Sequence, residues 1–390
     1  MTLVRPDAGD PGAVLRALRS AVLGAGPAVA LGAPPGVAGA AADPSPDVPA
    51  GTALVVTTSG STGYPKSVAL SRLALMSSAR ATADRIGEGA WLLALPAGYI
   101  AGAQVIVRSL VSGREPSVLA GKFSVAAFAA ATRKMASVQG GARVAAYTSL
   151  VPAQVATLLD SPEGERALAS FEAVLVGGQA LPPLVAERAA AAGIRLVRTY
   201  GSSETAGGCV YDGVPLDGVG VRIADGEVQV SGPTLADGYL GDPARTQASF
   251  VRDADGVRWY RTGDAGSFDG VLRVTGRIDN VLVSGGINVS LDRVEAVVRA
   301  LPGLHAAVVV AVPDERWGEA GVVIVDAGTR PDESALADLR SAVEASLGAA
   351  ARPREVIRID RIPLLSSGKP DRVALRSLAS ARGRPSAGSA

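Results

Sequence analysis

Two segments of this chain carry a lysine where chemistry on an anion would need one. The chain has four lysines against 34 arginines, and two of the four lie in glycine- and serine-rich segments, TTSGSTGYPKS (residues 57–67) and PLLSSGKPDR (residues 363–372). An ammonium is a compact point charge that a planar guanidinium cannot always replace. Because the chain otherwise prefers arginine so strongly, Lys66 and Lys369 are its first candidates for a catalytic or binding role.

The segment around Lys66 has the composition of a phosphate-binding loop. Successive backbone N–H groups with the freedom of glycine form a concavity that binds anions. Hydroxyls and an ammonium add donors that suit phosphate oxygens, so a nucleotide is the expected ligand, and an ordinary polar turn is the alternative. The residues concerned are Thr57, Thr58, Ser59, Gly60, Ser61, Thr62, Gly63 and Lys66.

This loop differs from that of the P-loop kinases and ATPases. Their pattern needs a second glycine five residues after the first, and counting from Gly60 that position is Pro65. The residues that follow, SVAL, alternate like a strand, whereas a P-loop opens a helix. We therefore expect strand, loop and strand, with a helix only after Ser71, a good N-cap.

Composition excludes several classes of function. The net charge is +1 and 48% of the residues are apolar, so the chain can form a large core and has no basic field for nucleic acid or an anionic membrane. A single cysteine, Cys209, excludes an intramolecular disulfide, and a single histidine, His305, argues against a Ser-His-acid triad or a histidine-built metal site. The uncharged residues 20–42 could span a membrane by length, but their prolines and small side chains favour a loop-rich surface segment.

The order of the expected elements predicts an α/β fold with two domains. Between residues 143 and 205, short apolar strands alternate with helical segments, which is the pattern of parallel βαβ units. After about residue 215 hairpins take over, with an Asp-Gly turn in VRIADGEVQV. We predict a large domain over 1–278 with a parallel sheet and a hairpin region, a small mobile α+β domain over 279–380, and a disordered tail over 381–390.

Six motifs, in one order, resemble the adenylate-forming superfamily of acyl-CoA synthetases, luciferases and peptide-synthetase adenylation domains. The resemblance implies that a carboxylate attacks the α-phosphate of ATP to give an acyl-adenylate and pyrophosphate, after which a thiol displaces AMP. One departure is Ser203, where the family usually has threonine. The motifs are the Lys66 and Lys369 segments, TYGSSET (199–205), GEVQVSGPTLADGYL (226–240), WYRTGD (259–264) and GRIDNVLVSGGINVSLDRVE (276–295).

The resemblance assigns a role to each matching residue. Lys369 would bridge the carboxylate and the α-phosphate, Lys66 and its loop would cradle the other phosphates, and Glu204 would hold Mg²⁺. Asp264 would accept hydrogen bonds from the ribose hydroxyls, and Arg277 would contact the ribose or a phosphate. The remaining ATP- and AMP-binding residues would be Gly177, Gly178, Gln179, Tyr200, Gly201, Ser203 and Thr205, of which the first four line the adenine slot.

The same resemblance implies a change of shape between the two steps. Asp279 would be the hinge about which the small domain rotates after adenylation. Lys369 would then leave, and the SGGIN loop would enter and form a tunnel for CoA, through Ser284, Gly285 and Gly286. A CoA thiol is already partly ionised near neutral pH, so the step needs little base catalysis.

The acid is expected to be 2-succinylbenzoate. Only 56 residues precede the loop, and LPAGYIAGAQVIVRSL (95–110) also resembles bacterial o-succinylbenzoate–CoA ligases of menaquinone biosynthesis. Tyr99 stands where that subfamily is expected to have histidine, and Arg108 is the candidate partner for the second carboxylate, with a surface arginine as the alternative. Another small aromatic or short-chain acid is the competing substrate.

These inferences describe a cytoplasmic enzyme that uses ATP, Mg²⁺, CoA and a small carboxylate, with no nucleic acid and no stable membrane insertion. Members of the family are often dimers, which suggests a homodimer. The other class of function is a relative that holds nucleotide without turnover. Such a protein should lack Lys369 or Glu204, yet both are present.

Overall fold

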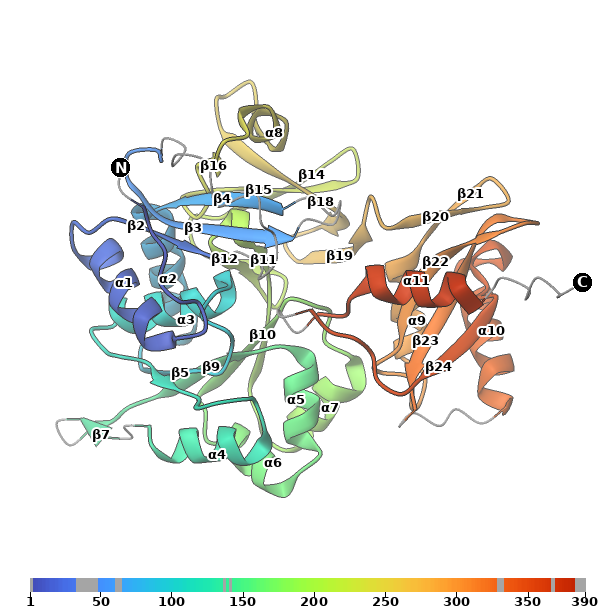
Figure 1. Ribbon diagram of the computed structural model, residues 1–390, viewed down its shortest axis with the longest axis horizontal. Helices are drawn as coiled ribbons and strands as arrows, with labels where there is room; N and C mark the ends of the chain where they lie inside the picture. Colours follow the sequence, from blue (N-terminus) through green and yellow to red (C-terminus); the bar gives the residue numbers. More distant parts are fainter. Residues whose placement is uncertain are drawn as a thin grey trace, which may run out of the picture.

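A computed structural model describes residues 3–32, 48–59, 65–135, 138–139, 142–327, 333–365 and 369–382. Figure 1 shows a large lobe, blue to yellow, beside a small lobe, orange to red, which the chain enters after β19. This confirms the predicted α/β fold with a large N-terminal and a small C-terminal part. In the described part of the chain, no helix has the length and apolar character to cross a membrane.

A seven-stranded sheet at the centre of the large lobe contains the predicted βαβ units. Its order is β13-β12-β11-β10-β9-β5-β6, and the strands from β11 to β6 run parallel. Successive side chains of β5 are buried on opposite faces, Trp91 in one core cluster and Leu92 in another, as in a sheet covered on both sides. The strands are β5 (Ala90–Leu93), β6 (Ser117–Val118), β9 (Ala146–Leu150), β10 (Ala173–Gly177), β11 (Leu196–Ser202), β12 (Gly207–Tyr211) and β13 (Val214–Pro215).

Helices cover the two faces of this sheet (Figure 1). On one face lie α1 (Pro11–Leu23), α2 (Arg72–Ile86) and α3 (Ile100–Val111), which share a core cluster with Trp91. As predicted, α2 begins after Ser71, whose hydroxyl accepts the Ala74 N–H at 3.1 Å. The other face is covered by α4 (Val125–Arg133), α5 (Pro152–Leu159), α6 (Pro162–Ala169) and α7 (Pro183–Ala191).

A second sheet supports the glycine- and serine-rich loop. Its order is β1-β2-β3-β4-β16, and β3 and β4 flank the loop as an antiparallel pair. The prediction of a surface segment over 20–42 needs correction, because residues 28–31 form the fully buried β2, held between β1 and β3. The strands are β1 (Leu3–Val4), β2 (Ala28–Leu31), β3 (Thr52–Ser59), β4 (Pro65–Ser71) and β16 (Gly238–Tyr239).

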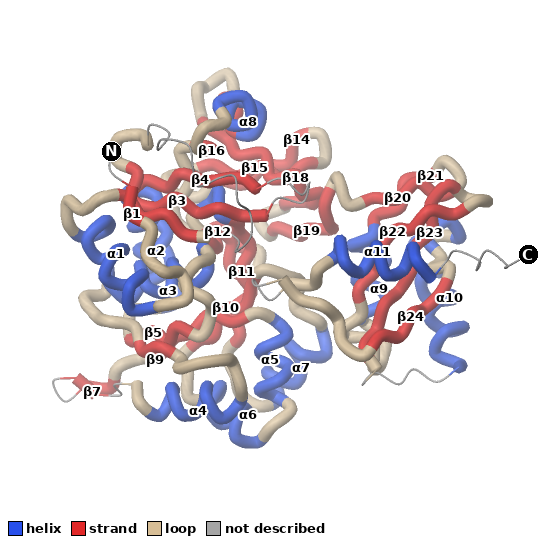
Figure 2. The backbone as a smooth tube through the Cα atoms, viewed as in Figure 1, coloured by secondary structure: helices blue, strands red, loops and turns tan. Residues whose placement is uncertain are grey.

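The predicted hairpin region forms a third sheet that faces the small lobe (Figure 2). The Asp-Gly turn lies between β14 and β15, with φ of 51° at Asp225 and 78° at Gly226, which matches the twist of a hairpin. The elements are β14 (Gly220–Ala224), β15 (Glu227–Ser231), α8 (Pro243–Ser249), β17 (Phe250–Arg252), β18 (Arg258–Phe268) and β19 (Leu272–Arg277). Short elements elsewhere in the lobe are β7 (Val138–Gln139), β8 (Ala142–Arg143) and η1 (Ser203–Thr205).

The small lobe is a five-stranded mixed sheet with helices. Its order is β21-β20-β23-β22, and β24 joins β23 in parallel. The last helix, α11, includes the first two residues of the predicted tail, and residues 383–390 lie outside the described residues. The elements are β20 (Val281–Ser284), β21 (Ile287–Ser290), α9 (Leu291–Arg299), β22 (Val308–Asp314), β23 (Gly318–Asp326), α10 (Glu333–Leu347), η2 (Ala349–Ala351), β24 (Glu355–Ile359) and α11 (Arg372–Arg382).

Candidate active site

Glu204 is an almost completely buried carboxylate at the carboxyl end of β11. Its side chain is on η1, a single turn that Thr205 fixes, because the Thr205 hydroxyl accepts the Ser202 N–H at 2.8 Å and donates to the Gly207 carbonyl at 2.7 Å. Glu204 is 2% exposed, and burial alone would raise its pKa. The Lys66 ammonium, which donates to Glu204 Oε1, outweighs this and lowers the pKa of the carboxyl below its ordinary value. Glu204 is therefore ionised and able to bind a cation.

Lys66 reaches Glu204 from the base of the glycine- and serine-rich loop. It lies at the start of β4, opposite Thr58 on β3, and the hydroxyls of Thr57 and Ser67 bond across the same pair at 2.9 Å. The Thr58 hydroxyl is buried and has no partner among the described residues, so it is available to a ligand. The predicted loop residues Gly60, Ser61, Thr62 and Gly63 lie outside the described residues, and Ser59 ends β3.

Asp264 and Tyr200 form the second part of the site. The Tyr200 hydroxyl donates to Asp264 Oδ2 at 2.6 Å, and Arg277 Nη1 donates to Asp264 Oδ1 at 3.2 Å. Burial raises the pKa of Asp264, and the bonds from Tyr200 and Arg277 counter part of that effect. Each carboxylate oxygen thus has one protein donor and keeps acceptor capacity for a ligand hydroxyl.

Arg277 also connects Asp264 to the segment between the lobes. Its guanidinium makes two parallel bonds of 3.0 Å to Asp279, and its Nη1 donates to the Thr262 carbonyl at 2.7 Å. Gly263 lies so close that a Cβ there would be 2.7 Å from Arg277 Nη2, so no other residue fits without a shift. Asp279 lies between β19 of the large lobe and β20 of the small one.

Lys369 comes to this site from the small lobe. In Figure 1 the chain between β24 and α11 reaches back to the large lobe beside β10. A Cβ on Gly178, just after β10, would be 3.7 Å from Lys369 Cε, so the two residues are in contact range. Although the side chain keeps access to solvent, desolvation of its ammonium lowers the pKa of Lys369, and the charges of Asp264 and Glu204 act in the opposite direction.

The base of the Lys369 segment is firmly held. The Leu365 N–H donates to the Lys369 carbonyl at 2.8 Å, and the Asp371 N–H donates to the Pro363 carbonyl at 2.9 Å. Three residues after the lysine, Arg372 Nη2 donates to the buried carboxylate of Glu295 on α9 at 2.8 Å. These bonds present one long, flexible side chain from a fixed backbone.

Several predicted residues lie around this centre. Gly177 ends β10, where a Cβ would be 2.4 Å from Thr199 Oγ1, and Gly178 has a φ of 82°, so both positions require glycine. Gln179 follows them on the same loop, and Gly201 and Ser203 adjoin Glu204 in the chain. Tyr99, half-buried, follows the carboxyl end of β5 and starts α3.

Two other predictions concern the residues expected to contact the acid and CoA. Arg108, expected beside the acid, is buried on α3, where its Nη2 donates to the Tyr211 hydroxyl at 3.2 Å and its guanidinium lies 5.3 Å from the Trp91 ring centroid. Its burial excludes the alternative of a surface arginine. Ser284, Gly285 and Gly286 form the turn between β20 and β21, which points away from the large lobe (Figure 1).

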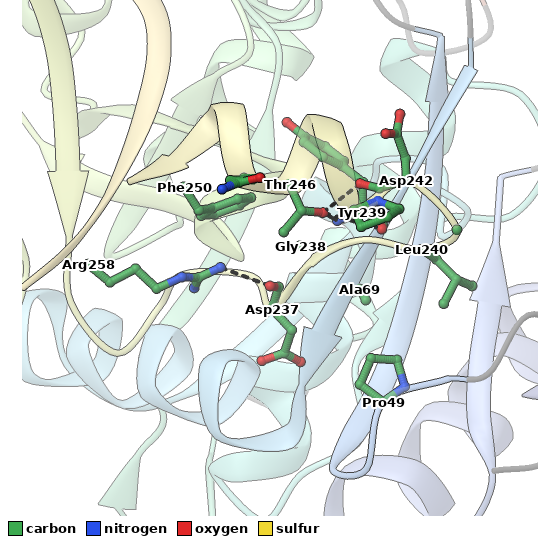
Figure 3. A pocket seen from close by; sticks show the side chains of 13 residues that line it. Pro49, Ala69, Asp237, Gly238, Tyr239, Leu240, Asp242, Thr246, Phe250 and Arg258 are labelled. Atoms are coloured by element: carbon green, nitrogen blue, oxygen red, sulfur yellow. Dashed lines mark hydrogen bonds between the residues drawn. The ribbon is translucent and has the colours of Figure 1, made fainter. Parts of the chain in front are cut away.

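Tyr239 belongs to the site although the sequence does not single it out. Its hydroxyl donates to Glu204 Oε1 at 2.9 Å, and its place in the matched motif GEVQVSGPTLADGYL is the signal that could have found it. Figure 3 shows Tyr239 beside a separate cavity of about 450 Å³ next to α8, lined also by Asp237 and Arg258. That cavity includes none of Glu204, Asp264 and Lys369, so volume alone would misplace the site.

Comparison with known proteins connects this geometry to a family. Residues 13–240 match the AMP-binding enzyme family, and residues 293–369 match the AMP-binding enzyme C-terminal domain. The chain is 43% identical over 332 residues to a probable 2-succinylbenzoate–CoA ligase of Mycobacterium tuberculosis, covering 83% of each protein. It is 30% identical over 342 residues to the 2-succinylbenzoate–CoA ligase of Listeria monocytogenes, covering 83% of this chain and 69% of the relative.

Solved structures agree with these sequence matches. The Bacillus subtilis o-succinylbenzoate CoA synthetase in complex with its acyl-adenylate intermediate superposes with a TM-score of 0.69 at 27% identity. The alignment covers 83% of this chain and 69% of that one. An ATP-bound enzyme chimera gives a TM-score of 0.72 at 24% identity over 85% of this chain and 69% of the other, which is a likeness of fold alone.

Proposed function

Because this chain belongs to the family of AMP-binding enzymes, we propose that it is an ATP-dependent CoA ligase that adenylates 2-succinylbenzoate and transfers the acyl group to CoA, for menaquinone biosynthesis. AMP and pyrophosphate are the other products. The observation that carries the proposal is the position of Lys369, which crosses from the small lobe to Gly178, where the charges of Asp264 and Glu204 act on it. The substrate follows from the named relatives and structural neighbours.

In the first half-reaction two anions must meet. A carboxylate oxygen of the acid forms a bond to the α-phosphorus while the bond from that phosphorus to the bridging oxygen breaks, and pyrophosphate leaves with the electron pair. Lys369 offsets the repulsion by placing one ammonium between the carboxylate and the α-phosphate. Lys66 and the Thr58 hydroxyl bind the departing phosphates, so catalysis consists of positioning and charge cancellation.

The residues present fit a magnesium ion carried in with ATP. Mg²⁺ is usually held by one or two carboxylates together with substrate phosphates. Glu204 is ionised beside the phosphate end of the site, and among the described residues no group of three or more acidic, histidine or cysteine side chains forms a metal site by itself. When bound, the ion would neutralise phosphate charge, and Glu204 would hold it.

In the second half-reaction CoA takes the place of the phosphates. Its thiolate attacks the acyl carbon, the bond from that carbon to the AMP oxygen breaks, and AMP leaves. We propose that rotation about Asp279 withdraws Lys369 and brings in the turn of Ser284, Gly285 and Gly286, because the segment from Arg277 to Asn280 is the connection between the lobes. The contact of Lys369 with Gly178 supports assigning the described arrangement to the adenylating step.

An ATP–pyrophosphate exchange assay with 2-succinylbenzoate, with and without CoA, tests the proposal. We expect exchange that depends on the acid, and mass-spectrometric detection of the acyl-CoA only when CoA is added. Release of orthophosphate in place of pyrophosphate, or exchange independent of the acid, would contradict it. The enzyme is also proposed to be cytoplasmic and homodimeric, which cell fractionation and sedimentation velocity would check.

A second candidate is a ligase for another small aromatic or short-chain acid. Tyr99 stands where histidine is expected, and the guanidinium of Arg108 already donates to the Tyr211 hydroxyl, which leaves it fewer donors for a second carboxylate. The same assay across benzoate, salicylate and short-chain acids separates the two candidates. A larger kcat/KM for a monocarboxylate than for 2-succinylbenzoate would favour this second function.

A further inference from the structure

Tyr239 and Lys66 share one oxygen of Glu204. The Tyr239 hydroxyl donates to Glu204 Oε1 at 2.9 Å, and the Lys66 ammonium donates to the same atom. The ammonium also lies 5.3 Å from the centroid of the Tyr239 ring, a cation–π distance. The three side chains form one compact group in which Glu204 is 2% and Tyr239 is 7% exposed.

The fold holds Tyr239 rigidly in this place. It pairs with Val68 across β16 and β4, two residues from Lys66, and its N–H donates to the Thr246 hydroxyl at 2.9 Å (Figure 3). Its ring packs on Phe250, with centroids 6.0 Å apart. These contacts fix the ring on both sides, so its hydroxyl stays within hydrogen-bond distance of Glu204 Oε1.

The two donors to Glu204 differ once substrate arrives. In the proposed function Lys66 turns toward the phosphates of ATP. Glu204 then loses its ion pair with Lys66, the one ion pair that it forms in the described part of the chain. A buried carboxylate that loses its partner is strongly destabilised unless another donor stays in place. Tyr239 cannot follow the phosphates, because its rigid ring packs on Phe250, whereas the lysine side chain is flexible, so the Tyr239 hydroxyl remains on Oε1.

We propose that Tyr239 is a positioning residue, whose hydroxyl fixes Glu204 Oε1 and leaves Oε2 to the divalent cation that enters with ATP. The proposal rests on the proposed function and adds to it a reason why the cation meets a carboxylate of fixed orientation. It also explains why one short strand, β16, is attached to the edge of the sheet that carries Lys66.

Tyr239→Phe tests this, because it removes the hydroxyl and keeps the ring. We expect the Mg²⁺ concentration for half-maximal pyrophosphate exchange to rise about tenfold, the order expected for a hydrogen bond to a charged group, with the KM for the acid unchanged. Saturating Mg²⁺ should restore the rate. Since the carboxylate loses the donor that orients it, calorimetry should also show weaker binding of Mg²⁺ to the ATP-loaded protein.

Tyr211→Phe is the matched control. Tyr211 is equally buried, and its hydroxyl bonds Thr82 at 2.9 Å and Arg108 at 3.2 Å, outside the site. It should leave the Mg²⁺ requirement and the Mg²⁺ affinity unchanged. Thermal unfolding is measured for both variants, and Tyr239→Met replaces Tyr239→Phe in the assay if the latter does not fold.

The outcomes separate this inference from the proposed function. If the unchanged enzyme catalyses no acid-dependent exchange, the proposed function fails. If it does, and Glu204→Gln raises the Mg²⁺ requirement while Tyr239→Phe leaves it as it was, the role of Tyr239 is overturned. A rate loss in Tyr239→Phe that excess Mg²⁺ does not restore would equally overturn it.

Discussion

The two lysines of the candidate site are held in opposite ways. Lys66 lies on a strand of the large lobe, and its charge is already paired with Glu204 before any ligand binds. Lys369 extends from a loop of the other lobe, forms no ion pair with the described residues, and has a pKa lowered by desolvation. Lys66 must leave its partner Glu204 to bind the phosphates of a substrate, whereas Lys369 gains a partner only when the substrate binds.

This difference has a physical reason. A paired lysine can sit permanently in the interior, but a desolvated ammonium without a partner is costly unless it can withdraw. Because Lys369 lies on the small lobe, movement of that lobe can return its ammonium to solvent. The comparison therefore predicts that Lys66 mainly affects binding and stability, and that Lys369 mainly affects the chemical step.

The largest effect is expected from Lys369→Ala. It should lower the rate of acyl-adenylate formation by about 10³-fold, because the developing charge at the α-phosphate loses its cation. ATP should still bind, as measured by calorimetry, and pyrophosphate exchange gives the rate. Lys122→Ala, at an exposed lysine outside the site, is the control. Normal pyrophosphate release in Lys369→Ala would remove the lysine from its proposed role.

Lys66→Met should have a smaller catalytic effect, about tenfold in the KM for ATP, together with a loss of stability. Glu204 loses the ammonium that lowers its pKa, so the variant should be less stable by about 2 kcal/mol at pH 7, below the full cost of breaking a buried pair because Lys66 is partly exposed. Because the pKa of Glu204 is lower in the folded than in the unfolded state, its ionisation stabilises the fold at a pH above the unfolded-state pKa. This stabilisation is lost as the pH falls through the folded-state pKa. Urea unfolding should therefore show the full difference at pH 7 and a progressively smaller one as the pH falls below the unfolded pKa of the carboxyl.

A substitution at the proposed hinge residue, Asp279, should affect one half-reaction more than the other. Asp279→Pro should spare adenylation and slow thioester formation about tenfold, because proline fixes the φ that the rotation must change. Single-turnover assays of each half-reaction measure the two rates. An equal loss in the rates of both half-reactions would contradict a hinge at Asp279 that serves only the second one.

The smallest effect is in the pH profile. Because desolvation lowers the pKa of Lys369, adenylation should decline on the alkaline side at a pH below the 10.5 of an ordinary lysine. Lys369→Arg should be slower but should lack that decline, since a guanidinium does not titrate there. An identical alkaline limb in both proteins would assign the decline to another group.

Much of the fold was predictable, and the exceptions have structural causes. The βαβ units, the Asp-Gly hairpin and the helix cap at Ser71 follow from local patterns that the tertiary structure preserves. Arg108 is a residue whose surroundings could not be predicted from the sequence. Residues 102–110 of α3 are all buried, so their pattern identifies no face, and only packing decides that Arg108 lies against Trp91 and Tyr211.

By itself the sequence determined the chemistry available to this protein. Two lysines in separate glycine- and serine-rich segments, one acidic residue after a strand and a glycine-rich turn identify a family because those residue types are few and their order is specific. Only the tertiary structure decided that Lys66, Tyr239 and Glu204 form one buried group, and that Lys369 joins it from the other lobe. Tyr239 and Lys66, 35 and 138 positions from Glu204 in the chain, reach it through sheet pairing, and Lys369 arrives through the docking of two lobes, which no local pattern encodes.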